Sequence, residues 1–154
     1  IFLLTIVIEV THMEKLTEET AALLAERFGK DSLVALATTE NGAPRVRVVN
    51  AYYEDGAFYV LTHALSGKMR QLAQDPRASI AGEWFTANGE GRSLGFVGRS
   101  ENQAIAARLR QAFAGWLGNG HTDLADENTH ILCIRLADGV LFSHGARFDI
   151  DFRP

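Results

Sequence analysis

The chain has 154 residues, of which 47% are hydrophobic, and this is enough material for one domain with a substantial core. Its formal net charge of −4 and isoelectric point near 5.7 argue against a nucleic-acid-binding surface, because such surfaces are normally basic. The single cysteine excludes an internal disulfide, and the five histidines lack close pairing with cysteine or aspartate, so we predict no metal site.

Residues 1–12 differ in character from the rest of the chain. Residues 1–8 are almost entirely apolar, but a membrane-spanning helix needs about 20 such residues, and a signal peptide needs a basic start and a small-residue cleavage site. Met13 directly precedes residues 14–17, which look like a natural domain start. We interpret residues 1–12 as vector-derived or upstream sequence, and residues 13–154 as one soluble, cytoplasmic domain.

The domain is expected to begin with a helix that starts at Thr17 and ends at Gly29. Thr17 is a suitable N-cap and is followed by two glutamates, which favour the positive end of the helix dipole. Residues 33–39 read as a buried strand, and Asn41 and Gly42 form a strong hairpin signal.

Residues 42–50 predict the next strand, in which arginine and valine alternate. Arg45 and Arg47 therefore share one face of the strand, while valines line the other. A turn at residues 54–56 leads to a second strand over residues 57–62.

A short helix is predicted after this hairpin. Ser66 is a plausible N-cap and Lys68 lies in the first turn, where unpaired backbone N–H groups and the helix dipole attract anions. Arg45 and Arg47 could bring further positive charge, so a phosphate-bearing ligand would suit this place. The alternative is that these arginines and the lysine are solvated surface residues.

The remaining segments alternate strands with one longer helix. The short helix should end at Asp75, before Pro76. We expect strands over residues 78–85 and 94–97, with a flexible glycine loop at residues 88–91 between them. Apolar residues at helical spacing predict a helix over residues 101–117.

The last hairpin is expected to pair residues 129–136 with residues 140–143, turning at Asp138 and Gly139. Cys133 lies among apolar residues of the first of these strands, so we interpret it as a buried thiol. Strands joined by short turns, with few crossover helices, indicate an antiparallel sheet closed into a barrel.

Two further places could contact a ligand. Trp84 stands in an aromatic pair before the glycine loop and could flank a planar ring, or it could close the end of the barrel. Near the C-terminus, His144 could donate a proton and Arg147 could hold an anion, although a simple surface turn explains both. His63 is a further candidate contact, and no pattern resembles a nucleophile with its base.

The order and spacing of these motifs resemble the FMN-binding split barrel of the pyridoxamine 5′-phosphate oxidase-like family, and are closest to its short members that are similar to general stress proteins. The resemblance runs from about Leu16 to near the C-terminus. It implies a mainly β fold with flanking helices (α+β), an antiparallel split β-barrel, and a homodimer with FMN at the subunit interface. It assigns cofactor contacts to Arg45, Arg47, Val48, Val49, Asn50, Leu61, Thr62, His63, Ser66, Gly67, Lys68 and, in the partner subunit, Trp84.

The chain departs from the family pattern in two ways. Gly67 stands where the family often has an arginine, which removes one positive charge that Arg70 or the strand arginines could replace. The C-terminal residues 147–154 lack the signature of true pyridoxamine-phosphate oxidases, so we do not expect vitamin B6 oxidation. The resemblance implies an FMN-dependent oxidoreductase of unknown substrate; a non-catalytic flavin or haem protein of a stress response, or an F420-dependent reductase, are the alternatives.

Overall fold

The computed structural model describes residues 13–154, so the interpretation of residues 1–12 lies outside the described residues. The first half of the domain contains β1 (Glu14–Lys15), α1 (Glu18–Phe28), β2 (Ser32–Glu40), β3 (Ala43–Glu54), β4 (Ala57–His63) and α2 (Gly67–Gln74). The second half contains β5 (Arg77–Gly82), β6 (Phe85–Phe96), a 3-10 turn (Ser100–Asn102), α3 (Gln103–Ala112), α4 (Ala114–Leu117), β7 (Thr129–Ser143) and β8 (Ala146–Asp151).

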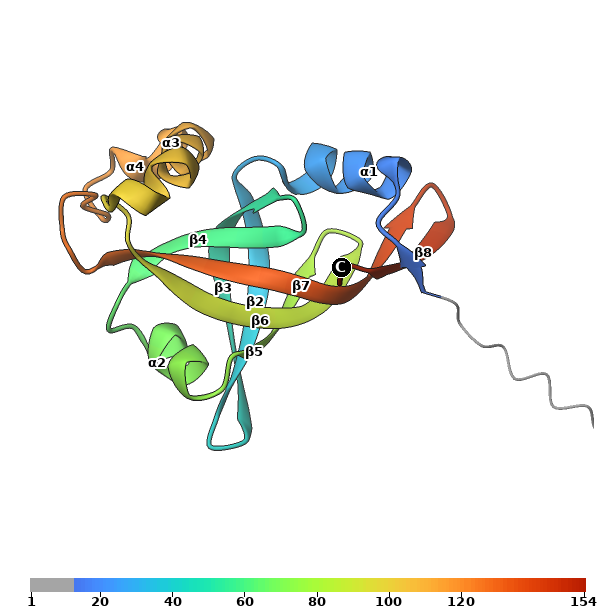
Figure 1. Ribbon diagram of the computed structural model, residues 1–154, viewed down its shortest axis with the longest axis horizontal. Coiled ribbons are helices and arrows are strands. Elements are labelled where there is room, and N and C mark those ends of the chain that lie inside the picture. The colour runs from blue at the N-terminus through green and yellow to red at the C-terminus, as the bar shows by residue number, and fades with distance from the viewer. Residues whose placement is uncertain (1–12) are drawn as a thin grey trace, which may run out of the picture.

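The strands form one sheet that closes on itself (Figure 1). Its order is β1-β8-β7-β4-β3-β2-β5-β6, and β6 also pairs with β7, so β2 through β7 form a closed ring. All pairings are antiparallel except that of β1 with β8. The predicted fold class, an antiparallel barrel with few helices, is therefore confirmed.

The helix α1 covers one end of the barrel and supplies part of its core. As predicted, Thr17 caps α1, and it forms a reciprocal capping box with Thr20. Leu24 and Phe28 are buried in the barrel interior, where Phe28 packs against the rings of Phe58 and Phe85. Burying these apolar side chains stabilises the barrel and fixes where β2 begins.

A second, smaller core lies outside the barrel, where α3 covers β4 and β7. Its fully buried members include Leu109, Phe113 and Ile131. The single helix predicted over residues 101–117 is in fact divided at Phe113, where the backbone leaves helical geometry between α3 and α4. Within residues 13–154 no helix has the length and apolar character needed to cross a membrane.

The barrel is open between β3 and β4. These strands pair only from Tyr52 to Glu54 on β3, whereas β2 pairs with β3 along its whole length. The β2–β3 hairpin therefore diverges from β4 and extends beyond the barrel, with α2 beside it (Figure 1). This opening places the side chains of β3, β4 and α2 around a common space.

The predicted glycine loop at residues 88–91 is wrong, because these residues lie within β6. A Cβ at Gly89 would lie 2.2 Å from the carbonyl oxygen of Arg135, and one at Gly91 would lie 2.8 Å from Leu72. The glycines therefore permit close packing and supply no flexibility. The strand expected over residues 78–85 also ends earlier, at a tight turn formed by Glu83 and Trp84.

The predicted turn at Asp138 and Gly139 is also wrong, since β7 runs through it without interruption. Gly139 pairs with Ala87 on one side and Ile150 on the other, and a Cβ there would lie 3.0 Å from Phe85. The last turn instead falls at His144 and Gly145, and it leads to β8, a strand that the sequence pattern did not reveal. Cys133 is buried in β7, as predicted.

Candidate functional site

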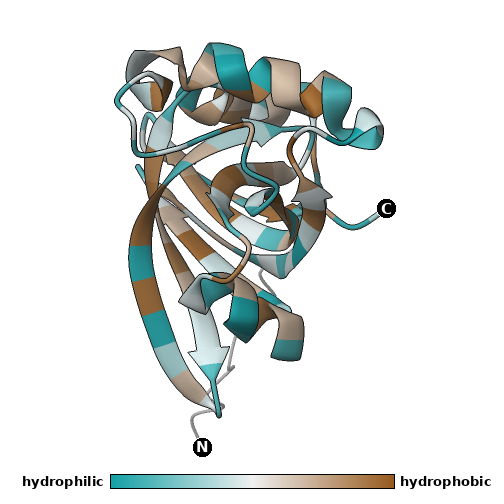
Figure 2. Cartoon of the chain, turned by 90° about the vertical axis from the view of Figure 1, so that its left-hand side faces the viewer, coloured by the Kyte–Doolittle hydropathy of each residue, from teal (hydrophilic) through white to brown (hydrophobic). Residues whose placement is uncertain are grey.

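The alternation predicted for β3 is confirmed, and it places the two arginines on the side facing the opening. Val46 and Val48 point to the outside of the barrel and are 72% and 67% exposed. Arg47 lies on the opposite face and is only partly exposed. Figure 2 shows the resulting alternation of hydrophilic and hydrophobic bands along the long hairpin.

Arg47 reaches into the interior and joins three elements. Its guanidinium donates to Thr38 Oγ1 on β2 at 2.7 Å and to Gln71 Oε1 on α2 at 2.7 Å. The Thr38 hydroxyl also donates to Gln71 Oε1, at 2.6 Å. The partners of this cation are neutral oxygens, so its charge is fixed in position without being neutralised.

Lys68 brings a second positive charge to the same opening. Its ammonium donates a hydrogen bond of 2.9 Å to Thr62 Oγ1, which lies at the end of β4. The hydroxyl groups of Thr62 and Ser66 lie 3.3 Å apart, so the loop from β4 to α2 places two hydroxyls beside the ammonium. We call Arg47, Thr62, Ser66 and Lys68 the cation cluster.

The start of α2 completes the cation cluster with backbone groups. Ser66 occupies the N-cap position, as predicted, but its side chain makes no capping hydrogen bond and instead approaches Thr62. The first-turn N–H groups of α2 are consequently free of a side-chain cap from Ser66. Such groups favour an anion, and α2 also carries Lys68 in its first turn.

Arg47 lies close enough to Lys68 to influence the protonation of the lysine. Burial lowers the pKa of Lys68, and the positive charge of Arg47 lowers it further. Burial also lowers the pKa of Arg47, with a smaller contribution from Arg45. Within residues 13–154 neither Arg47 nor Lys68 forms an ion pair with a carboxylate. An anion entering the opening would relieve this unfavourable accumulation of positive charge.

The backbone of β3 adds hydrogen-bonding groups to the opening. From residue 43 to residue 51, β3 is paired with β2 on one side, but on its other side it has no strand partner in the described part of the chain. An edge of this kind presents N–H and C=O groups that need partners. The opening thus combines an anion-binding end with a row of backbone donors and acceptors.

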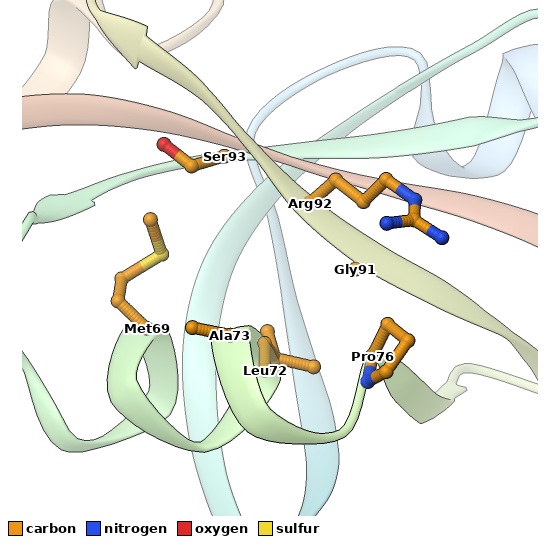
Figure 3. Close-up of a pocket in the computed structure, with 7 residues that line it drawn as sticks. All are labelled: Met69, Leu72, Ala73, Pro76, Gly91, Arg92 and Ser93. Atoms are coloured by element: carbon orange, nitrogen blue, oxygen red, sulfur yellow. The ribbon is translucent and has the colours of Figure 1, made fainter.

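A cavity of about 330 Å³ lies between α2, the helix that carries Lys68, and β6 (Figure 3). Met69 and Leu72 project into it from α2, while Ser93 borders it on β6. Ser93 Oγ lies 3.1 Å from His130 Nδ1, and His130 is directly opposite Thr62 in the pairing of β4 with β7. The cavity is mainly apolar on its helix side, and Arg92 and Ser93 line it on the side of β6.

Several other residues assigned to the cofactor by the resemblance lie outside the cation cluster. Arg45 is held by Glu40, Asn50 donates to Asp31, and the ring of His63 accepts from the backbone N–H of Leu65. Val49 is part of the barrel core, whereas Leu61 packs toward α3. Gly67 is the first residue of α2.

Trp84, His144 and Arg147 lie apart from the cation cluster in this chain. Trp84 and His144 border a hollow at the end of the barrel near the C-terminal end of α1, where Arg27 donates to the carbonyl oxygen of Phe142. Arg147 lies over the Phe142 ring and forms an ion pair with Asp149. Within one chain these residues therefore border a different part of the surface from the cation cluster.

Sequence reasoning missed the neutral partners of the cation cluster. Thr38 lies at the end of a strand that reads as uniformly buried, and Gln71 lies on a helix whose register the sequence does not fix. His130 and Ser93 are brought together by the pairing of β6 with β7, between residues far apart in the chain. Only the two threonines that end this otherwise apolar run, Thr38 and Thr39, could have served as a signal.

The chain matches a known protein family in sequence. The family model described as "Pyridoxamine 5'-phosphate oxidase" matches residues 16–140. No curated protein matches the chain in sequence.

Solved structures share the fold at low identity. General Stress Protein 26 from Bacillus anthracis is 16% identical over 79% of this chain and 89% of its own, with a TM-score of 0.59. An FAD-binding protein from Mesorhizobium loti is 12% identical over 82% of this chain and 94% of its own, with a TM-score of 0.62. A heme-binding protein from Mycobacterium smegmatis is 20% identical over 89% of this chain and 60% of its own, with a TM-score of 0.65. At such identities the likeness establishes the fold alone.

Proposed function

The chain belongs to the pyridoxamine 5′-phosphate oxidase family, and on this premise we propose that it binds FMN in the opening between β3 and β4. The family match over residues 16–140 confirms the resemblance drawn from the sequence. In this proposal the protein is a cytoplasmic flavin-dependent oxidoreductase, and its substrate differs from that of the vitamin B6 oxidases.

The observation that carries this proposal is the pair of cations, Arg47 and Lys68, that lie in one opening without a carboxylate partner among the described residues. Lys68 and the first turn of α2 suit a phosphate group, because they supply charge-assisted and backbone hydrogen bonds. The unpaired edge of β3 suits a heterocycle that carries its own donors and acceptors, such as the pyrimidine part of the flavin ring.

FMN, when bound, would accept and deliver electrons, while the residues of this chain bind and orient it. Lys68, Ser66 and Thr62 would hold the phosphate, and Arg47 would keep the opening positive. Because Gln71 and Thr38 fix the Arg47 guanidinium, the site is organised before the ligand arrives.

We further propose that the protein acts as a homodimer through the outer face of β2, β3 and β5. Across this face Val48 lies opposite Ala35, which lies opposite Ala81, and a second row joins Val46, Ala37 and Ser79. These rows contain no charged residue, and Val46 and Val48 are largely exposed. A second copy that presents the same face would cover them, because a two-fold interface is self-complementary.

Dimerisation would also account for Trp84, which is 70% exposed in this chain. The family resemblance places Trp84 at the flavin of the partner subunit. Its distance from the cation cluster within one chain agrees with a contact made between subunits.

Haem and the deazaflavin F420 are the alternative ligands. A heme-binding protein among the structural neighbours motivates the first. F420 carries a polyglutamate tail that favours an extended basic surface, and the net charge of −4 argues against it.

An absorption spectrum of the purified protein tests the proposal. The spectrum should be recorded before and after the addition of FMN and the removal of excess ligand. Flavin bands retained in near-stoichiometric amount are expected, whereas a Soret band would indicate haem. A well-folded dimer that retains neither would contradict the proposal.

A second experiment separates an oxidoreductase from a passive flavin carrier. NADH and NADPH are added anaerobically to the FMN-loaded protein, and the bleaching of the flavin is followed. Reduction far faster than that of free FMN would support an enzyme, while reduction at the rate of free FMN would indicate a carrier.

A further inference from the structure

Two arginines at the edge of the opening share one carboxylate, that of Glu40. Arg45 Nε lies 3.2 Å from Glu40 Oε2, and Arg70 Nη2 lies 3.4 Å from Glu40 Oε1. These interactions lower the pKa of Glu40, chiefly through the hydrogen bond from Arg45 and then through that from Arg70. Glu40 is therefore ionised at neutral pH, and its single negative charge offsets one of the two positive charges of the arginines.

The position of Arg70 connects this ion-pair cluster to the proposed phosphate site. A Cβ atom placed on Gly67 would lie 3.8 Å from Arg70 Nη2, so the guanidinium lies over the first turn of α2. The same turn carries Lys68. Since Gly67 has no side chain, the space beside it is available to Arg70.

Glu40 is the last residue of β2. It lies at the base of the turn of the β2–β3 hairpin, which projects beside α2 (Figure 1). It pairs with Ala43 across the turn, and it reaches both Arg45 on β3 and Arg70 on α2. The carboxylate thus lies at the rim of the opening between the hairpin and the helix. The ion pairs are partly exposed, so their partners can exchange without unfolding the barrel.

We infer that Glu40 is an intramolecular competitor of the ligand's phosphate group, which restrains Arg45 and Arg70 and thereby weakens phosphate binding. The inference rests on the proposed function, because it concerns the same opening. Binding of a phosphate requires the arginines to leave Glu40, or requires the phosphate to bind beside a carboxylate of like charge. Glu40 is therefore a positioning residue that sets the affinity for phosphorylated ligands, with no direct contact to the flavin ring.

The test compares Glu40→Gln with the wild-type protein in titrations with FMN and with riboflavin, which lacks the phosphate. Glutamine retains the length of the side chain but removes its charge. We expect FMN to bind about threefold to tenfold more tightly to the variant, from release of two surface ion pairs. Riboflavin affinity should not change. The control is Glu101→Gln, which removes another carboxylate paired with an arginine, Arg99, outside the site.

A double-mutant cycle with Arg70→Gln identifies the route of the effect. If Glu40 acts by holding Arg70, then Glu40→Gln should improve FMN binding less in the Arg70→Gln background than in the wild-type background. A gain that is equal in both backgrounds would overturn the role of Arg70.

The outcomes distinguish this inference from the proposed function. Unchanged FMN affinity in Glu40→Gln, combined with a loss of affinity in Lys68→Met, would overturn the competition and leave the phosphate site standing. An equal gain for FMN and riboflavin, or a gain in Glu101→Gln of the same size, would also overturn it. If the wild-type protein binds no FMN at all, both the proposed function and this inference fail.

Discussion

The ammonium of Lys68 donates a 2.9 Å hydrogen bond to the hydroxyl of Thr62, and this contact ties the first turn of α2 to the end of β4. Thr62 is buried, so the lysine side chain is drawn toward the barrel and away from bulk water. A partly buried cation without a carboxylate partner is unfavourable in the ligand-free protein. The same cation becomes favourable once an anion enters, so Lys68 should favour the binding of a phosphate group.

Lys68→Met should weaken FMN binding while the barrel remains folded. The substitution removes a charge-assisted hydrogen bond to the phosphate, which is worth about 1.5–3 kcal/mol. Titration with FMN, followed by the quenching of flavin fluorescence, measures the change. Riboflavin should bind equally well to variant and wild type, and Lys30→Met serves as a control for loss of an exposed lysine. Equal FMN affinity in wild type and Lys68→Met would exclude Lys68 from the site.

The affinity for FMN should fall as the pH rises toward the ordinary lysine pKa of 10.5, because the pKa of Lys68 is lowered by burial and then by Arg47. Between the lowered pKa and the ordinary pKa, Lys68 is largely deprotonated in the folded chain but protonated in the unfolded chain. The unfolded chain therefore binds more protons at this residue. The contribution of Lys68 to the stability of the ligand-free protein therefore rises with pH across this window. Chemical denaturation and FMN titration at several pH values test both trends. Both trends are read as the difference between the wild type and Lys68→Met. Burial raises the pKa of three tyrosines and of Cys133 in both proteins, and these groups lower the stability as the pH rises.

Val48→Asp should dissociate the proposed homodimer. Val48 lies in an uncharged row with Ala35 and Ala81, so an aspartate there would bury an unpaired charge twice in a two-fold interface. We expect the dissociation constant to rise at least about 100-fold. Sedimentation velocity provides the measurement, and Leu65→Asp, at an exposed position on the loop before α2, is the control. A wild-type monomer, or a Val48→Asp dimer of unchanged stability, would show that this face is not the interface.

Trp84→Gly should leave the domain as stable as the wild type, or up to about 1 kcal/mol more stable. Trp84 has a φ of 51°, a left-handed conformation that costs little in glycine and more in other residues. The side chain is largely exposed, so little packing is lost. Trp84→Val is the matched comparison, because a β-branched residue is poorly suited to this backbone and should lower the midpoint of thermal unfolding. Equal stability of the two variants would show that the turn is not strained.

Much of the fold could be predicted because its signals are local. The capping threonine and terminal glycine of α1 and the alternation along β3 are properties of neighbouring residues, and the structure confirms them. Ser66 was correctly placed at the start of α2, although its hydroxyl contacts Thr62 and does not cap the helix.

The errors arose where a glycine served packing between distant segments. Gly89, Gly91 and Gly139 each lie within a strand, at places where a Cβ would collide with another part of the barrel. Conversely, the turn at Glu83 and Trp84 contains no glycine, and Trp84 takes up positive φ, so this turn carries little turn signature. Neither feature can be recognised before the strands are paired.

The candidate site was partly predictable, because some of its residues belong to local sequence patterns. Lys68 and Ser66 belong to a short local motif, and Arg47 follows from the alternation of β3. Gln71 and Thr38 join them only through the packing of α2 against β2. The restraint of Arg45 and Arg70 by Glu40 likewise depends on the tertiary arrangement of the hairpin and the helix.

Isothermal titration calorimetry of the wild-type protein with FMN and with riboflavin tests the central claim most directly, because the two ligands differ only by the phosphate. If the cation cluster is a phosphate site, FMN should bind at least about 10-fold more tightly than riboflavin. The difference should shrink as salt is added, because the interaction is electrostatic. Equal affinities for the two flavins, or no binding of either, would contradict a phosphate site at Lys68 and Arg47.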